Sequence, residues 1–430
     1  MKRSQREAAA RGSTHLLRLS LPAVRSNGSF EGADILAEGA AVPAILLCQV
    51  YRGVMAWALT PAAEHAGLFP PHAAAETRRL MAESAVPEQL RPALEVICDL
   101  FGDPGGADPG RVADACARIG EWADGRDDAQ ATAFGFMQAA ATCSPNDARM
   151  AYRAGSIARH HAQWDVADFW FRHGVAVGRR TRDWEGHATA YLALGNSYTQ
   201  RGRYASAKRE HLKALRVSKR HGLRELQGKA YHDLLIVSIE LREWLEAEGC
   251  AQKAFYAYGP THSNVRILAH DVAYLWNIRG HFERALPVFR ALLPHFDQPQ
   301  ARIRVLAGIG RAAGGANHRE QFFSAWNEVQ RITPAIERSP SVPASLLQIT
   351  YGAAALQEWE LAESGAEYAL QTALDRGEAD IVAEAEQTLA AIRTRVIPGE
   401  LMQSRAHDPF AESAETLVED LVASLETARI

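Results

Sequence analysis

The stretch from Tyr191 to Ala214, YLALGNSYTQRGRYASAKREHLKA, places an aromatic residue, Tyr204, three positions before a small one, Ala207. The same pairing returns along the chain at Trp164/Ala167, Trp244/Ala247, Phe282/Ala285 and Trp359/Ala362. A weaker copy of it falls at His318 and Gln321. A fixed period of roughly 40 residues is typical of a stacked array, in which each unit buries its apolar face only against its neighbours.

Each unit of this array is expected to consist of two helices. In the segment 188–200, Tyr191, Leu194 and Tyr198 recur at helical spacing, and Gly202 lies in the turn that follows. The segment 205–221 then continues with a second helical pattern. We expect the two helices to approach closely at Gly195 and Ala207, with the aromatic residue after the turn filling the space beside this contact.

The residues Tyr191-x-x-Leu194-Gly195-x-x-Tyr198, followed by Ala207, His211 and Ala214, resemble the tetratricopeptide repeat (TPR) pattern, with Tyr in place of Trp and His in place of Phe. The resemblance covers residues 148–395 in about six extended units. It implies an all-α, right-handed superhelical solenoid of antiparallel helix pairs. The first helix of each pair would line the concave wall.

The rest of the chain divides around this array. Residues 1–39 are expected to form a flexible arm, and residues 40–147 a helical region that degenerate repeats would explain. Residues 396–430 contain an acidic amphipathic helix, which either caps the open end of the array or fills the groove as a partner-binding tail. The apolar window 40–59 is long enough to span a membrane, but Pro43, Gln49, Arg52 and Gly53 favour a buried core helix.

The composition indicates a folded, soluble, cytoplasmic protein that does not bind membranes. Hydrophobic residues make up 47% of the chain and charged residues 23%. The five cysteines are odd in number and widely spaced, which favours reduced, buried thiols. Arg18 interrupts the only hydrophobic patch near the N-terminus, so a secretory signal is not expected. The preference for Arg over Lys is typical of GC-rich bacterial genomes.

No motif in the sequence predicts a catalytic residue, a cofactor or a metal site, so we do not expect an enzyme. The segment Gly308-Ile309-Gly310-Arg311-Ala312-Ala313-Gly314 is one residue too long for a dinucleotide fingerprint and falls within an expected helix. His160 and His161 are adjacent, and neighbouring helical residues point about 100° apart, so both cannot face one ion.

The repeat frame predicts which side chains line the concave wall. In the first two units these peptide-binding candidates are Arg149, Tyr152, Arg153, Ser156, Arg159, Asn196 and Gln200, with Leu192 among them. In the next two they are Lys229, His232, His270, Tyr274 and Asn277. Cations, amides and aromatic rings together suit an acidic or carboxyl-terminated peptide. Some TPR proteins hold a terminal carboxylate with a Lys and Asn clamp, but Leu192 and Asp233 replace two of its members here.

The segment 149–229 is a basic island, with 17 Lys and Arg against 6 Asp and Glu. Within it, Arg209, Lys213, Arg216 and Arg220 form a stripe along the second helix of a unit. This convex patch is either a solvated surface, a docking site for an acidic protein or a nucleic-acid contact.

The function favoured by the sequence is a non-enzymatic adaptor or regulatory subunit that binds an acidic protein or peptide in its groove. A nucleic-acid-associated regulator using the basic island is an alternative, and a peptide-sensing regulator with an effector domain in 1–147 is another. The sequence does not predict an oligomeric state.

Overall fold

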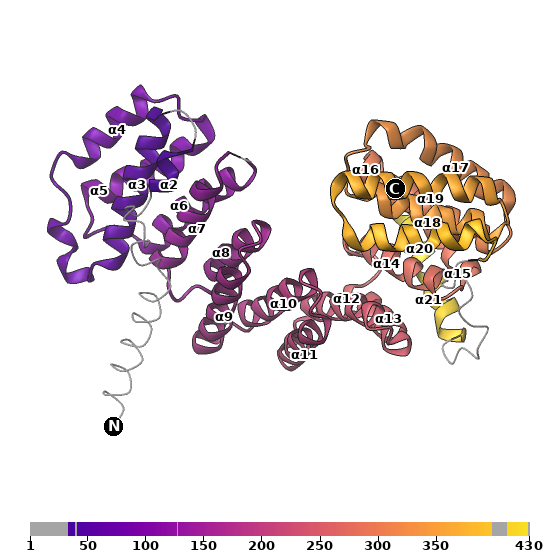
Figure 1. Ribbon diagram of the computed structural model, residues 1–430. Coiled ribbons are helices and arrows are strands. Elements are labelled where there is room, and N and C mark those ends of the chain that lie inside the picture. The colour runs from indigo at the N-terminus through magenta and orange to yellow at the C-terminus, as the bar shows by residue number, and fades with distance from the viewer. Residues whose placement is uncertain (1–32, 39–40, 127, 398–410, 429–430) are drawn as a thin grey trace. The chain divides into compact units, whose positions relative to one another are not determined.

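The computed structural model describes residues 33–38, 41–126, 128–397 and 411–428, and every regular element within these ranges is a helix (Figure 1). The chain divides into two compact units, 1–226 and 227–430, which are taken separately below. The predicted all-α array of antiparallel helix pairs is confirmed. The handedness of the superhelix stays a prediction.

The first unit is a succession of helices that pack on their neighbours in sequence from α4 onward. They are α2 (Ala33–Leu36), α3 (Ala41–Leu59), α4 (Ala73–Glu83), α5 (Arg91–Gly102), α6 (Pro109–Asp124), α7 (Gln130–Cys143), α8 (Ala148–His160), α9 (Trp164–Thr181), α10 (Trp184–Gln200) and α11 (Tyr204–Arg220), with the short 3-10 helices η1 (Ala62–Gly67) and η2 (Glu88–Leu90) between them.

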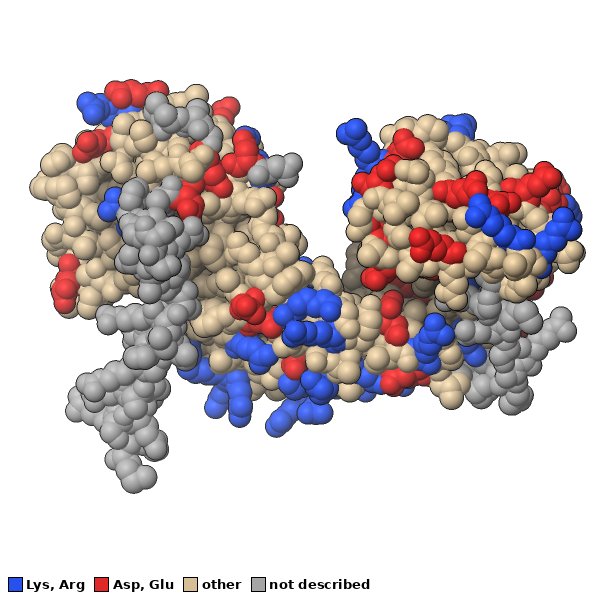
Figure 2. Space-filling model, viewed as in Figure 1, with Lys and Arg blue, Asp and Glu red and all other residues tan. Residues whose placement is uncertain are grey.

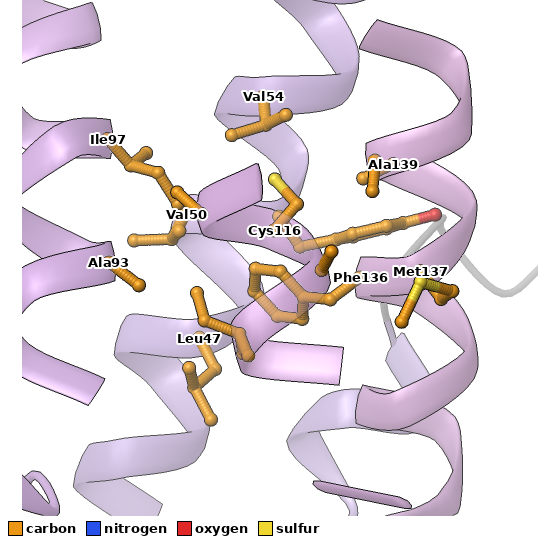
Figure 3. Close-up of a cluster of buried hydrophobic side chains, with 14 of the residues drawn as sticks. Leu47, Val50, Val54, Ala93, Ile97, Cys116, Phe136, Met137 and Ala139 are labelled. Atoms are coloured by element: carbon orange, nitrogen blue, oxygen red, sulfur yellow. The ribbon is translucent and has the colours of Figure 1, made fainter. Parts of the chain in front are cut away.

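Residues 41–59 of the apolar window form α3, which contributes one side to the core. Val50 and Val54 of α3 are fully buried and lie beside Ile97 of α5 and Phe136 of α7 (Figure 3). No helix in the described part of the chain is long and apolar enough to cross a membrane. One side of α3 therefore belongs to the core, while Ile45 and Leu59 of the same helix are exposed.

The same hydrophobic core continues from Ile35 in α2 to Trp170 in α9 without a break at residue 147. Helices on both sides of residue 147 therefore share one core, and the division of the chain at 147 stays a prediction. The arm expected over 1–39 also ends earlier, since Glu38 accepts hydrogen bonds from the backbone N–H of Thr132 at 2.8 Å and from its hydroxyl at 2.7 Å. Residues 1–32 of that arm lie outside the described residues.

Tight turns join the helices at intervals of twenty residues. Residues with positive φ occur at Ala162, Arg182, Gly202, Gly222 and Arg242, and a new helix begins two residues after each of them. At the first of these turns, Gln163 N–H donates to Ala158 O at 2.8 Å, and at the third, Arg203 N–H donates to Tyr198 O at 2.9 Å. These bonds are those of a Schellman motif, which ends one helix and leaves room for the next.

The helix crossings depend on glycine, as predicted, but the ring that fills each crossing is a different one. A methyl group at Gly155 of α8 would overlap the ring of Phe171 in α9, and one at Gly195 of α10 would overlap the ring of His211 in α11. Phe171 and His211 are both fully buried. The prediction for the aromatic residue after the turn was wrong, because Trp164 and Tyr204 begin their helices and stay half-buried at the rim.

The second unit continues the same pattern of helix pairs. Its helices are α12 (Arg224–Glu240), whose first turn lies before the division, α13 (Trp244–Tyr258), α14 (Val265–Ile278), α15 (Phe282–Leu292), η3 (Leu293–His295), α16 (Pro299–Gly315), α17 (Arg319–Ile332), η4 (Thr333–Ala335), α18 (Ser341–Ala355), α19 (Trp359–Arg376), α20 (Ala379–Arg393) and α21 (Ala411–Thr427). From α8 to α19 the helices form six successive pairs, and α20 follows as a single helix.

The glycine-rich segment 308–314 lies inside α16, where the sequence placed a helix. A methyl group at Gly314 would overlap the backbone of Gly352 in α18, and one at Gly352 would overlap Gly310 O. The glycines therefore allow two helix backbones to touch. In the following helix, α17, the predicted pair at His318 and Gln321 is displaced by one residue, because α17 begins at Arg319 and the buried fourth position is Phe322.

The C-terminal helix α21 packs one side against α13, α14 and α15. Leu417, Leu421 and Leu425 are buried there, and Leu425 O lies 2.8 Å from His295 Nε2. This position differs from a cap over the last helix, α20. Phe410 and the rest of 398–410 lie outside the described residues.

Candidate functional site

The predicted peptide-binding wall is formed by the first helix of each pair, here called the A-helix face. In the first unit, two of its three arginines on α8 pair with carboxylates of α6. Arg149 pairs with Asp114 at 3.2 Å, and Arg153 Nε donates to Glu121 Oε1 at 3.0 Å. These ion pairs offset the charge of Arg149 and Arg153.

Two further wall residues of α8 carry buried polar atoms. Ser156 Oγ and Arg159 Nε have no hydrogen-bond partner among the described residues. Tyr152 is half-buried, with its ring centroid 6.2 Å from that of Phe171. These three side chains therefore lie at the wall, though much of each is covered.

On α10, the amide side chains of Asn196 and Gln200 reach the surface. Asn196 is half-buried and Gln200 is exposed, and neither has a hydrogen-bond partner within the described ranges. Leu192, one turn before Asn196, is buried and offers little surface. The α10 part of the wall is thus a pair of free amides.

In the second unit, the A-helix face contains a carboxylate shared by two histidines. Asp271 Oδ2 lies 2.9 Å from His232 Nε2, and Asp271 Oδ1 lies 3.1 Å from His270 Nδ1. Burial alone would raise the pKa of Asp271, but hydrogen bonds from the two imidazoles and their charge outweigh it and lower that pKa to about 2. The cluster joins α12 to α14.

The remaining predicted residues of this unit divide into two groups. Lys229 and Tyr274 are half-buried and each has a partner. Asn277 is fully buried and donates from Nδ2 to Gly308 O at 2.9 Å, so it joins α14 to α16 and does not line an open wall. This bond adds a side-chain contact from α14 to the backbone of α16.

The predicted convex patch on α11 does not act as one stripe. Lys213 Nζ donates to both oxygens of Glu210, at 2.8 and 2.9 Å. Arg209 donates to Ser206 Oγ at 3.0 Å. Only Arg216 and Arg220 remain, and they line a pocket.

This arginine pocket, of about 710 Å³, lies between α9, α10 and α11 in the first unit. Its lining is Arg172, Val175, Ala176 and Arg179 from α9, Trp184, His187 and Tyr191 from α10, and Arg216, Val217, Arg220 and His221 from the end of α11. Figure 2 shows Lys and Arg gathered over the region of these helices. The four arginines face no carboxylate in the lining.

Sequence reasoning found two of these arginines and missed the other two. Arg172 and Arg179 are seven residues apart, about two turns of α9, so they lie on the same side of that helix. This spacing is the signal in the sequence that could have found them. The two arginines of α9 meet those of α11 only where the two helix pairs stack.

Among the described residues, no group of three or more His, Cys, Asp or Glu side chains is placed to hold a metal ion. All five cysteines are buried, and none of them forms a disulfide. The arrangement is suited to binding a charged ligand at a surface.

The helix pairs, with a small residue at each crossing and a turn every twenty residues, are TPR-like. No family model matches the sequence, and no curated protein matches it. Solved structures with a similar fold include BtubC from P. vanneervenii, at 16% identity and a TM-score of 0.42, covering 54% of this chain and 93% of that one. At these values the likeness carries no argument about function.

Two further solved structures are similar at identities and TM-scores that are also too low to support an argument about function. The apo form of RapI is 13% identical with a TM-score of 0.44, and covers 66% of this chain and 98% of its own. The TPR2AB domain of yeast Sti1, solved in complex with pHSP90, is 13% identical with a TM-score of 0.27, and covers 66% of this chain and 99% of its own.

Proposed function

We propose that this protein is a non-enzymatic adaptor or regulatory subunit that binds a protein or peptide on its A-helix face. The observation that carries the proposal is the pair of free amides, Asn196 and Gln200, on α10. An amide side chain offers one acceptor and two donors, which match the N–H and C=O groups of an extended peptide.

The ion pairs of α8 support this proposal and change the expected partner. Arg149 and Arg153 are already neutralised by Asp114 and Glu121, so this wall has little net attraction for a strongly acidic peptide. We therefore expect the A-helix face to select a polar, weakly charged segment.

The test is affinity purification of the full chain from its host, with quantitative mass spectrometry. We expect Asn196→Ala combined with Gln200→Ala to lose at least one partner that the unmodified chain recovers. The matched control is Gln252→Ala, a half-buried amide on α13, the second helix of its pair. Recovery of the same partners with the double variant would contradict the proposal.

The alternatives differ in how the structure bears on them. A peptide-sensing regulator with an effector domain in 1–147 is not favoured, since the core continues through residue 147. A nucleic-acid-associated regulator would use the basic island. If the protein does not bind DNA or RNA at about 50 mM salt, the nucleic-acid alternative is eliminated, because phosphate contacts are strongest at low salt.

A further inference from the structure

The arginine pocket lies outside the face to which the proposed function assigns binding. Its cations come from α9 and α11, which are the second helices of two successive pairs. α10 supplies only the aromatic wall between them. The pocket is therefore a site of its own, formed where one pair stacks on the next.

None of the four arginines has its charge neutralised by a carboxylate of the described residues. Arg179, Arg216 and Arg220 form no ion pair or hydrogen bond with any residue in the described ranges. The fourth, Arg172, donates from Nη2 to the hydroxyl of Tyr198 at 2.7 Å, which leaves its charge unneutralised. Like charges gathered at one pocket repel each other, and an anionic ligand would remove that repulsion.

The wall between the arginines is apolar and held in position. The rings of Trp184 and His221 stack with centroids 4.3 Å apart and planes 9° from parallel. His187 is buried, and its Nδ1 lies 2.8 Å from Val175 O, which fixes the ring against α9. A wall that is already ordered loses little entropy when an apolar group binds to it.

We propose that the arginine pocket binds an acidic segment of a partner protein, with an apolar side chain on the aromatic wall and flanking carboxylates on the arginines. Guanidinium groups bind carboxylates through two parallel N–H bonds. Val175, Ala176 and Val217 supply the apolar surface that such an anchor side chain needs.

A protein segment fits this surface better than a nucleic acid does. A nucleic-acid strand needs a continuous row of cations to follow its phosphates. Here the row along α11 is interrupted, because Lys213 is paired with Glu210. Trp184 and His221 also cover part of each other's faces, which reduces the area open to a stacked base.

The experiment selects ligands for the folded full chain from a displayed library of random peptides. We expect enrichment of sequences in which Asp or Glu flank an aromatic or aliphatic residue. The strongest peptide is then synthesised with a fluorescent label and measured by anisotropy, beside an oligothymidylate of equal net charge.

Variants locate the binding. Arg216→Glu combined with Arg220→Glu should weaken peptide binding by about ten-fold or more, because two charge-assisted contacts become repulsive. Arg209→Glu is the matched control, an exposed arginine of α11 outside the pocket, and should change binding less than about two-fold. Ala176→Glu, at an exposed helical position in the lining, should weaken binding without disturbing the core.

Each other outcome overturns the proposal. These are a selection with no acidic enrichment, an equal loss with Arg209→Glu, and tighter pocket-dependent binding of the oligothymidylate. Asn196→Ala with Gln200→Ala should leave the labelled peptide's affinity unchanged. The experiment therefore distinguishes a failure of the proposed pocket binding from a failure of the proposed binding on the A-helix face.

Discussion

Gly195 of α10 lies against the imidazole ring of His211 in α11, so closely that a methyl group at position 195 would overlap the ring. His211 is fully buried and belongs to the packing between the two helices. The pair shows how each unit of the array closes. A residue without a side chain on one helix receives a ring from the next.

Gly195→Ala should therefore destabilise the protein by about 1–2 kcal/mol, since overpacking outweighs the gain in helix propensity. Thermal or denaturant unfolding of the full chain measures this change in the free energy of unfolding. In a His211→Ala background the same change should have no unfavourable effect, because the ring it meets is gone. Gly249→Ala on α13 is the control, where a methyl group meets only Lys253 Nζ at 3.8 Å.

Glu38 stabilises the start of α7 from a distance in sequence of more than ninety residues. It accepts hydrogen bonds from both the backbone N–H and the hydroxyl of Thr132, near the helix N-terminus. Glu38→Ala should lower the free energy of unfolding by about 1–2 kcal/mol, as the loss of a helix cap does. Glu38→Gln should retain part of this stabilisation, because an amide oxygen can still accept a hydrogen bond. Equal stability of Glu38→Ala and the unmodified chain would show that the contact does not matter.

Asp271 should give the protein an acid-dependent part of its stability. Its folded pKa of about 2 lies below the ordinary value of 3.8, so its contribution is complete above about pH 4 and is lost as the pH falls towards 2. At neutral pH, Asp271→Asn should lower the free energy of unfolding by about 2 kcal/mol. The difference from the unmodified chain should shrink below pH 4.

The measurement is denaturant unfolding at several pH values. Asp375→Asn is the control for removing a carboxylate, because Asp375 is exposed and only accepts a hydrogen bond from Gln371. A constant difference between Asp271→Asn and the unmodified chain from pH 7 to pH 2 would contradict the assigned role.

The five cysteines should react slowly with thiol reagents in the folded protein. All are buried, and burial raises the pKa of Cys98 to about 11, which leaves little thiolate at neutral pH. The pKa of Cys116 is raised by a hydrogen bond with Cys143 and by burial. The measurement is the reaction of the thiols with a chromogenic disulfide reagent. The folded protein should react slowly, and the denatured protein should react at all five thiols. Rapid native reaction of Cys98 would contradict this.

Local features of the chain could be predicted from the order of its residues. The sequence predicted helix pairs at a period of about forty residues, a close helix approach at Gly195 and the helical nature of the segment 308–314, because helix periodicity and turn chemistry are properties of short segments.

Only the tertiary structure decided which charges and rings face one another. It paired Arg153 with Glu121, buried Asn277, left Trp164 at the rim, and brought Arg179 of α9 to the same pocket as Arg216 of α11. Residues some forty positions apart meet only when one helix pair stacks on the next. The pairing of charges depends on that distance in space, which spacing along the chain does not encode.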